Sequence, residues 1–399
     1  MYQAPSKGGP SQAAPMRRAD NGGGLSRQDT ASVYAALDLG TNNCRLMIAH
    51  LHNSQFRIIE AFSRIVRLGE GLTASGKLNE RAMERALKAL KICADKIEKR
   101  GAVHIRAVAT QACRIAANGA AFIARIERET GLHFTIISPE EEAHLAVTGC
   151  TSLLDSRDLS PPARTALVMD VGGGSTELSW VELSPMPPFE TIPPPQDSQV
   201  QAQHNALKLV RKMPRPAYWV SIPIGVVNLA ESFPVMVSDS LKAADVTAWF
   251  ESMVDTVSQA VRAFTPPEAL RSHFDRGEAY IVGTSGAITS LAGVHLGLER
   301  YDRSKVDGLW MSHDHIQSVI KHLLSVGHAG REREPCIGKD RADLVLAGAA
   351  ILEAVYRLWP CERLRVADRG LREGLLLSMA KKKTRRRRRR ARKTATVVA

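Results

Sequence analysis

The sequence lacks the patterns that mark disulfide-bonded, zinc-binding and membrane-spanning proteins. Its six cysteines are scattered and form no C-x-x-C pair, which excludes a dense disulfide framework and is typical of reduced thiols. The longest apolar stretch, residues 344–352, is far too short to cross a bilayer. Residues 1–31 are rich in Gly, Ser, Pro and Gln and lack the apolar core of a signal peptide. We therefore expect a disordered leader over 1–31, a cytoplasmic location and no membrane partner.

Acidic residues are absent from the C-terminal end, which concentrates the positive charge there. Segment 381–393 holds eleven basic residues, and subtracting these eleven from the formal net charge of +13 leaves +2 on residues 1–380. Like charges repel, so we expect a disordered basic tail over 381–399. The tail is either a solvated end without a task or a tether that captures polyanions. A nucleic-acid-binding protein is a weaker interpretation, because the rest of the chain is nearly neutral.

Two aspartate–glycine turns, 132 residues apart in the chain, are the most informative motifs. Residues 38–43 read DLGTNN and residues 170–177 read DVGGGSTE. Each turn follows an apolar strand and precedes a returning strand, and a third glycine turn (283–286, GTSG) follows the apolar residues 279–282. Glycine lets the backbone approach a ligand closely, and successive N–H groups suit phosphate oxygens. The pattern predicts two related lobes that face one phosphate-binding cleft.

The order of predicted elements also repeats. Three strands, a helix, a strand and a helix occur in residues 32–158 and again in residues 159–380. We therefore predict an α/β fold with two lobes, each a mixed sheet with flanking helices, around a central cleft. Residues 184–216 contain eight prolines and are predicted to be an exposed loop inserted in the second lobe. The apolar helix over 344–358 is expected in the core rather than at a subunit interface.

Residues 138–143 (SPEEEA) predict the start of a helix. Ser138 suits the N-cap, Pro139 the first helical position and Glu141 the partner in a capping box. Glu142 has no such structural task, and its helical neighbours are nonpolar. Partial burial would raise its pKa, as a general base requires. Glu142 is therefore the first candidate for catalysis, and Glu141 is the second.

Three carboxylates and three arginines complete the candidate site. Asp170 and Glu177 lie on opposite arms of the second hairpin, so their side chains can face one position, and Asp38 has the place of Asp170 in the first hairpin. Carboxylate oxygens suit Mg²⁺, which bridges to phosphate. Guanidinium groups bind phosphate oxygens bidentately, but each arginine has a surface ion pair as its alternative use. The arginines in question are Arg45, Arg67 and Arg114.

Several ordered motifs identify a family resemblance. They include ALDLGTNNCRLMIA, VRLGEGL, ISPEEEAHLA, VMDVGGGSTEL and ADRGLREGLL. With these motifs the chain resembles the exopolyphosphatase/guanosine pentaphosphate phosphatase family, within the actin–sugar kinase–chaperone ATPase superfamily. The resemblance implies two actin-like (ribonuclease H-like) lobes, a magnesium cofactor and a homodimer. The implied activity is hydrolysis of terminal phosphoanhydride bonds of inorganic polyphosphate or guanosine pentaphosphate, with release of orthophosphate.

The resemblance also implies roles for single residues, and it puts the catalytic glutamate at Glu142. The metal candidates are Asp38, Asp170 and Glu177. The phosphate-binding candidates lie in the three glycine turns and among the arginines: Gly40, Thr41, Asn42, Asn43, Arg45, Arg67, Arg114, Gly172, Gly173, Gly174, Ser175, Thr176, Gly283, Thr284, Ser285 and Gly286. Two other functions stay open, namely another ATPase or kinase of the superfamily and a non-catalytic sensor of a guanosine polyphosphate.

Overall fold

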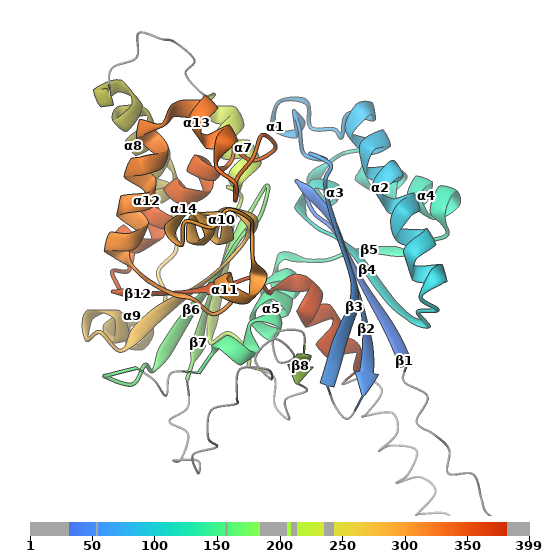
Figure 1. The fold of residues 1–399 in the computed structure, drawn as a ribbon, viewed down its shortest axis with the longest axis horizontal. Helices are drawn as coiled ribbons and strands as arrows, with labels where there is room; N and C mark the ends of the chain where they lie inside the picture. Colours follow the sequence, from blue (N-terminus) through green and yellow to red (C-terminus); the bar gives the residue numbers. More distant parts are fainter. Residues whose placement is uncertain are drawn as a thin grey trace, which may run out of the picture. The chain divides into compact units, whose positions relative to one another are not determined.

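The computed structural model describes residues 32–52, 55–155, 159–183, 206–208, 214–234 and 243–380 (Figure 1). The predicted leader, the basic tail and most of the proline-rich segment lie outside these ranges. None of the described helices is long and apolar enough to cross a membrane.

The first mixed sheet has the strand order β5-β4-β1-β2-β3-β8. β1 pairs antiparallel with β2 and parallel with β4. The β1–β2 turn and the residues that follow β4 therefore lie at the same edge of the sheet. The buried faces of these strands are aliphatic and form the core of this lobe with α2 and α4. The strands are β1 (Ser32–Leu39), β2 (Asn43–His52), β3 (Gln55–Ile65), β4 (His104–Ala109), β5 (Phe134–Ile136) and β8 (Ala206–Lys208).

The second mixed sheet has the strand order β11-β12-β10-β6-β7-β9. Its strands β12-β10-β6-β7-β9 repeat the order and directions of β5-β4-β1-β2-β3. The predicted duplication and the predicted α/β class are therefore confirmed. The strands are β6 (Thr165–Val171), β7 (Thr176–Glu182), β9 (Tyr218–Ile222), β10 (Ala279–Thr284), β11 (Trp310–Ser312) and β12 (Arg363–Ala367).

Helices flank both sheets (Figure 1). In the first half of the chain they are α1 (Leu72–Ser75), α2 (Glu80–Lys99), α3 (Gln111–Ile115), α4 (Gly119–Thr130) and α5 (Pro139–Gly149). In the second half they are α7 (Val226–Ser232), α8 (Ala243–Arg262), α9 (Glu268–Asp275), α10 (Gly286–His295), α11 (Arg303–Val306), α12 (His313–Ser325), α13 (Gly327–Arg333) and α14 (Val345–Leu358). A last described helix covers residues 371–380. α14 is buried from Val345 to Tyr356, so this apolar helix belongs to the core, as predicted.

Two helices lie between the sheets, α5 and the helix over residues 371–380 (Figure 1). α5 packs against β6, β7 and β9 of the second sheet, although it follows the first sheet in the chain. Leu375 and Leu376 pack instead with Tyr34 and Met47 of the first sheet. The chain therefore exchanges one helix between its halves, which chain order alone does not show. The two helices approach so closely that a Cβ at Gly374 would lie 2.0 Å from the carbonyl oxygen of Leu145.

The proline-rich segment is not wholly irregular. Its residues 206–208 form β8, which pairs antiparallel with β3 at the edge of the first sheet. Backbone pairing with an open strand edge does not require a particular side-chain pattern. The prediction of a loop over 184–216 is therefore wrong at these three residues.

Candidate active site

A cavity of about 530 Å³ collects the predicted glycine turns in one place. Five of the segments that line it follow β1, β4, β6, β10 and β12. These strands are parallel to one another within each sheet, so the five segments lie at the carboxyl ends of the strands. Ligands of open α/β sheets bind at such strand ends. We call this space the central cavity. The predicted residues that line it are Asp38, Gly40, Thr41, Asn42, Asn43, Arg45, Glu142, Asp170, Gly172, Gly173, Gly174, Ser175, Thr284, Ser285 and Gly286.

The two hairpins have the same backbone geometry. The N–H of Gly40 donates to the carbonyl of Asn43 at 2.9 Å, and the N–H of Gly172 donates to that of Ser175 at 2.8 Å. In strand register Asp38 faces Arg45, whereas Asp170 faces Glu177. The duplicated turns thus present an aspartate at equivalent positions, next to an arginine in one lobe and a glutamate in the other.

The second turn is glycine-rich because the first lobe packs directly onto it. A Cβ on Gly173 would lie 2.9 Å from the backbone nitrogen of Asn42, and one on Gly174 would lie 1.6 Å from Oε1 of Gln111. α7 supports the turn from behind, where the N–H of Val227 donates to the carbonyl of Gly173 at 2.7 Å. A larger residue at Gly173 would press on the backbone of the first turn, whereas one at Gly174 would first displace the Gln111 side chain.

Glu142 lies at the cavity in a desolvated position. It is on the first turn of α5, whose N-cap is Ser138 and whose first residue is Pro139, as predicted. Its side chain is 10% exposed and accepts a hydrogen bond of 3.1 Å from Nη1 of Arg114. Burial and the nearby Glu177 carboxylate raise the pKa of Glu142 well above its usual range, while Arg114 opposes this shift. The carboxyl group is therefore suited to accept a proton near neutral pH.

Glu141 is placed differently. Its backbone N–H donates to Oγ of Ser138, and its carboxylate forms an ion pair with Arg106 on β4. The side chain does not line the central cavity. This placement disfavours the second candidate, because the carboxylate is already paired and lies away from the turns.

Two aspartates face the cavity from opposite lobes. Burial raises the pKa of Asp38, and Oδ1 of Asp38 has no hydrogen-bond partner among the described residues. Burial and Glu177 raise the pKa of Asp170 to about 8. Asp38 has Arg45 beside it in strand register, whereas Asp170 has the like charge of Glu177 beside it. Glu177 lies behind them, accepts a hydrogen bond of 2.8 Å from Ser221 and does not line the cavity.

Arginines line the cavity without carboxylate partners. Among the described residues, Arg45, Arg341 and Arg372 form no ion pair, although all three border the cavity. An added Cβ on Gly286 would lie 3.8 Å from Nη2 of Arg45 and 4.0 Å from Cζ of Arg341. Guanidinium groups from both halves of the chain therefore converge on one glycine turn, which favours an anionic ligand.

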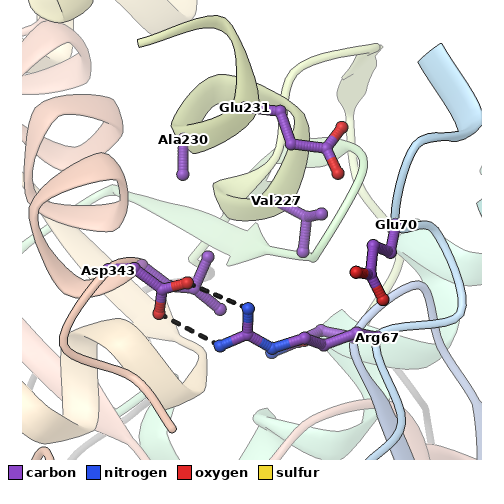
Figure 2. Close-up of a pocket in the computed structure, with 8 residues that line it drawn as sticks. Arg67, Glu70, Val227, Ala230, Glu231 and Asp343 are labelled. Carbon is purple, nitrogen blue, oxygen red and sulfur yellow. Dashed lines mark hydrogen bonds and ion pairs between the residues drawn. The ribbon is translucent and has the colours of Figure 1, made fainter. Parts of the chain in front are cut away.

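Arg67 does not reach the central cavity. Its guanidinium faces Asp343, with Nη1 to Oδ2 at 3.0 Å and Nη2 to Oδ1 at 3.3 Å (Figure 2). This ion pair borders a separate cavity of about 200 Å³ that Glu70 and Glu231 also line. Asp343 neutralises the charge that phosphate binding would use, and the phosphate-binding role of Arg67 stays a prediction. The ion pair bridges the two halves of the chain.

The remaining candidates are partly structural. Oγ1 of Thr176 donates to the carbonyl of Ile224, and Thr176 is buried outside the cavity lining. A Cβ on Gly283 would lie 2.8 Å from Ile288, so this glycine permits core packing. Ser285 caps α10 through its hydroxyl, which leaves its backbone at the cavity wall. Arg114 acts through Glu142 and is not itself in the lining.

Several lining residues were not predicted. Thr110 and Gln111 follow β4, and Tyr301 and Arg303 precede or begin α11. Thr110 could have been predicted from its position directly after an apolar strand, because the glycine turns of the site also follow apolar strands. Tyr301 and Arg303 gave no such signal, since they reach the cavity only through tertiary packing.

Comparisons with known proteins give the same picture. The sequence model of the Ppx/GppA phosphatase family matches residues 47–383. The crystal structure of the Aquifex aeolicus member of the Ppx/GppA protein family is 28% identical, has a TM-score of 0.63 and covers 88% of this chain and 98% of its own. An exopolyphosphatase-like protein is 26% identical with a TM-score of 0.68, over 88% of this chain and 99% of its own.

A third structure, an exopolyphosphatase from Cytophaga hutchinsonii, is 22% identical with a TM-score of 0.68 and covers 87% of this chain and 97% of its own. At this identity the likeness supports the fold alone. The family match, in contrast, extends over most of the sequence. The chain therefore belongs to the Ppx/GppA phosphatase family and is a hydrolase of that family.

Proposed function

We propose that this protein hydrolyses the terminal phosphoanhydride bond of inorganic polyphosphate or guanosine pentaphosphate and releases orthophosphate. The observation that carries the proposal is the position of Glu142, a buried carboxylate on a cavity that also holds two glycine turns and unpaired arginines. Such a cavity binds a polyanion and offers a base to one water molecule. Family membership supports the same class of reaction.

In the proposed reaction Glu142 orients and deprotonates the attacking water. Arg114 holds the carboxylate in place, and the raised pKa of Glu142 makes it a stronger base than an exposed glutamate. The backbone N–H groups of the glycine turns and the side chains of Arg45 and Arg341 hold the terminal phosphates. Because the transition state of phosphoryl transfer is loose, positioning and electrostatics supply most of the rate.

We further propose a magnesium ion held by Asp38 and Asp170. Among the described residues no group of three or more His, Cys, Asp or Glu side chains is placed to hold a metal. Mg²⁺ commonly uses only one or two carboxylates together with water and substrate phosphates. The unpartnered Oδ1 of Asp38 and the raised pKa of Asp170 fit that use. When bound, Mg²⁺ supplies positive charge to the transferred phosphoryl group.

The cavity lining favours polyphosphate over a nucleotide as the main substrate. Tyr301 is the one aromatic residue in the described lining, and its hydroxyl already donates to Asp368 at 2.8 Å. A purine base usually stacks on an aromatic or guanidinium face, and in the proposed reaction the guanidinium groups of Arg45 and Arg341 hold the phosphates instead. Polyphosphate needs only cations and N–H donors, which line the cavity.

The test is orthophosphate release from polyphosphate and from guanosine pentaphosphate, each with Mg²⁺ and with excess EDTA. We expect release from at least one substrate, dependent on the divalent cation. Tight binding of either compound without release would favour a non-catalytic sensor. Sugar- or protein-dependent ATP turnover in place of phosphate release would favour another enzyme of the superfamily.

A further inference from the structure

Arg372 is a cation at the central cavity with no partner of its own. It is the second residue of the helix over 371–380 and lines the cavity beside Gly370 and Leu371. Among the described residues it forms neither an ion pair nor a hydrogen bond, since none of the interactions there includes its guanidinium. The side chain is partly buried, and a guanidinium without an ion-pair partner at a cavity suits an anionic ligand from outside the chain.

The neighbouring carboxylate is engaged elsewhere. Glu373 is fully buried, its Oε1 accepts a hydrogen bond of 2.9 Å from Nη2 of Arg303, and its Oε2 accepts one of 2.9 Å from the N–H of Gly370. Both oxygens are thus occupied. Arg303 also forms an ion pair of 3.4 Å with Asp368, which Tyr301 holds through its hydroxyl. These hydrogen bonds hold the Glu373 carboxylate against Arg303 and Gly370, and among the described residues Glu373 forms no ion pair with Arg372.

Arg372 and Arg45 line the same cavity but come from different parts of the fold. Arg45 comes from β2 in the first sheet, whereas Arg372 comes from the exchanged helix. Burial and the Arg45 guanidinium lower the pKa of Arg372, while Glu373 opposes this shift. Asp38, Arg45 and Arg372 all line the central cavity. Two guanidinium groups on one cavity, neither of them in an ion pair among the described residues, suit the closely spaced charges of a condensed phosphate.

We propose that Arg372 binds the phosphate chain of the substrate together with Arg45, and that Arg303 is a positioning residue that keeps Glu373 away from Arg372. This inference rests on the proposed function for the identity of the substrate. The binding step itself requires only that a condensed phosphate enters the central cavity. Arg303 also lines the central cavity, and its positioning role is exerted through the Glu373 carboxylate that it holds.

The experiment is calorimetric titration of inorganic tripolyphosphate, with Mg²⁺, into variants built on Glu142→Gln, so that turnover does not consume the probe. Arg372→Met should raise the Kd about 10- to 100-fold, the usual loss for hydrogen bonds to a charged group. Arg164→Met is the control, because Arg164 is exposed and pairs with Glu278 away from the cavity. Equal Kd values for Arg372→Met and Arg164→Met would overturn the assignment.

The positioning role needs a separate readout. Arg303→Met should also raise the Kd, because the released Glu373 carboxylate then pairs with Arg372. Adding Glu373→Gln to Arg303→Met should restore most of the affinity, whereas adding it to Arg372→Met should restore none. A loss that Glu373→Gln does not rescue in the Arg303→Met background would mean that Arg303 only stabilises the fold, and the positioning role would be rejected.

Thermal unfolding of each variant identifies those that fail to fold. If Arg372→Met does not fold, Arg372→Lys and Arg372→Gln replace it. Arg372→Lys should bind tripolyphosphate more tightly than Arg372→Gln, because lysine keeps the positive charge. Equal affinities of these two variants would reject the assignment. If Arg372→Met weakens tripolyphosphate binding but the unmodified protein releases no phosphate from any substrate, the proposed function alone is rejected. Normal hydrolysis with a Kd unaffected by Arg372→Met would reject this inference alone.

Discussion

Arg45 and Glu177 occupy equivalent positions in the two hairpins but carry opposite charges. Arg45 faces Asp38 across β1 and β2, and Glu177 faces Asp170 across β6 and β7. The duplicated scaffold therefore has one arm that neutralises its aspartate and one that adds a second negative charge. Burial and, after it, the Glu177 carboxylate raise the pKa of Asp170 to about 8, so the acidic arm is the place where a cation has most to stabilise.

The two adjacent glutamates of α5 should differ sharply in their effect on catalysis. Glu142→Gln removes the base and should lower kcat by roughly 10²–10⁴ with little change in substrate binding. Glu141→Gln is the matched control and should cost far less, because Glu141 pairs with Arg106 outside the cavity. Steady-state phosphate release measures both. Equal losses in the two variants would contradict the role of Glu142.

Removing Arg114 should shift the pH dependence of the reaction. Arg114 lowers the pKa of Glu142, so Arg114→Met should raise that pKa further. A smaller fraction of Glu142 is then deprotonated at any given pH, and the acidic limb of the kcat/KM profile should move to higher pH. Arg114→Lys retains the charge and should shift the limb less. A limb that does not move in Arg114→Met would indicate that another group titrates there.

The magnesium requirement should depend on the carboxylates that line the cavity. Asp170→Asn should raise the Mg²⁺ concentration for half-maximal rate, because it removes a charge that faces the cation. Glu177→Gln should have a smaller effect, since Glu177 is bound to Ser221 behind the lining. Glu98→Gln, on the exposed face of α2, is the control. Full activity of the unmodified protein in excess EDTA would remove the metal from the mechanism.

The close contact between α5 and the helix over 371–380 should make the protein's stability sensitive to the size of residue 374. Gly374→Ala places a methyl group 2.0 Å from the carbonyl oxygen of Leu145, so the helices must separate. Overpacking of this kind costs about 1–3 kcal/mol. Urea unfolding should show the loss, and Ser318→Ala on the exposed face of α12 should change stability by less than about 0.5 kcal/mol. An unchanged midpoint for Gly374→Ala would show that the helices can move apart freely.

The basic tail should affect only long substrates. Deleting residues 381–399 should raise KM for long-chain polyphosphate at low salt and flatten its salt dependence, because binding by eleven cationic side chains works through counterion release. The value of kcat and the KM for guanosine pentaphosphate should stay the same. An unaltered KM for long chains at low ionic strength would leave the tail without this task.

The sequence by itself determined the local parts of the site. The strand–turn–strand pattern around Asp38 and Asp170, the helix start at Ser138 and the burial of Glu142 follow from periodicity, glycine positions and capping preferences, all of which act within a few residues. The repeated order of these elements was sufficient to predict two related mixed sheets.

Only the tertiary structure decided which distant charges meet. Arg67 pairs with Asp343, and Arg303 pairs with Glu373, across separations of 276 and 70 residues. The same holds for α5 and the helix over 371–380, which pack against sheets other than those beside them in the chain. A long side chain accepts any partner within its reach, so its partner depends on how the lobes fold together and not on its neighbours in sequence. For that reason the sequence alone did not show that Arg67 pairs with Asp343, or that Arg372 lines the central cavity without an ion pair among the described residues.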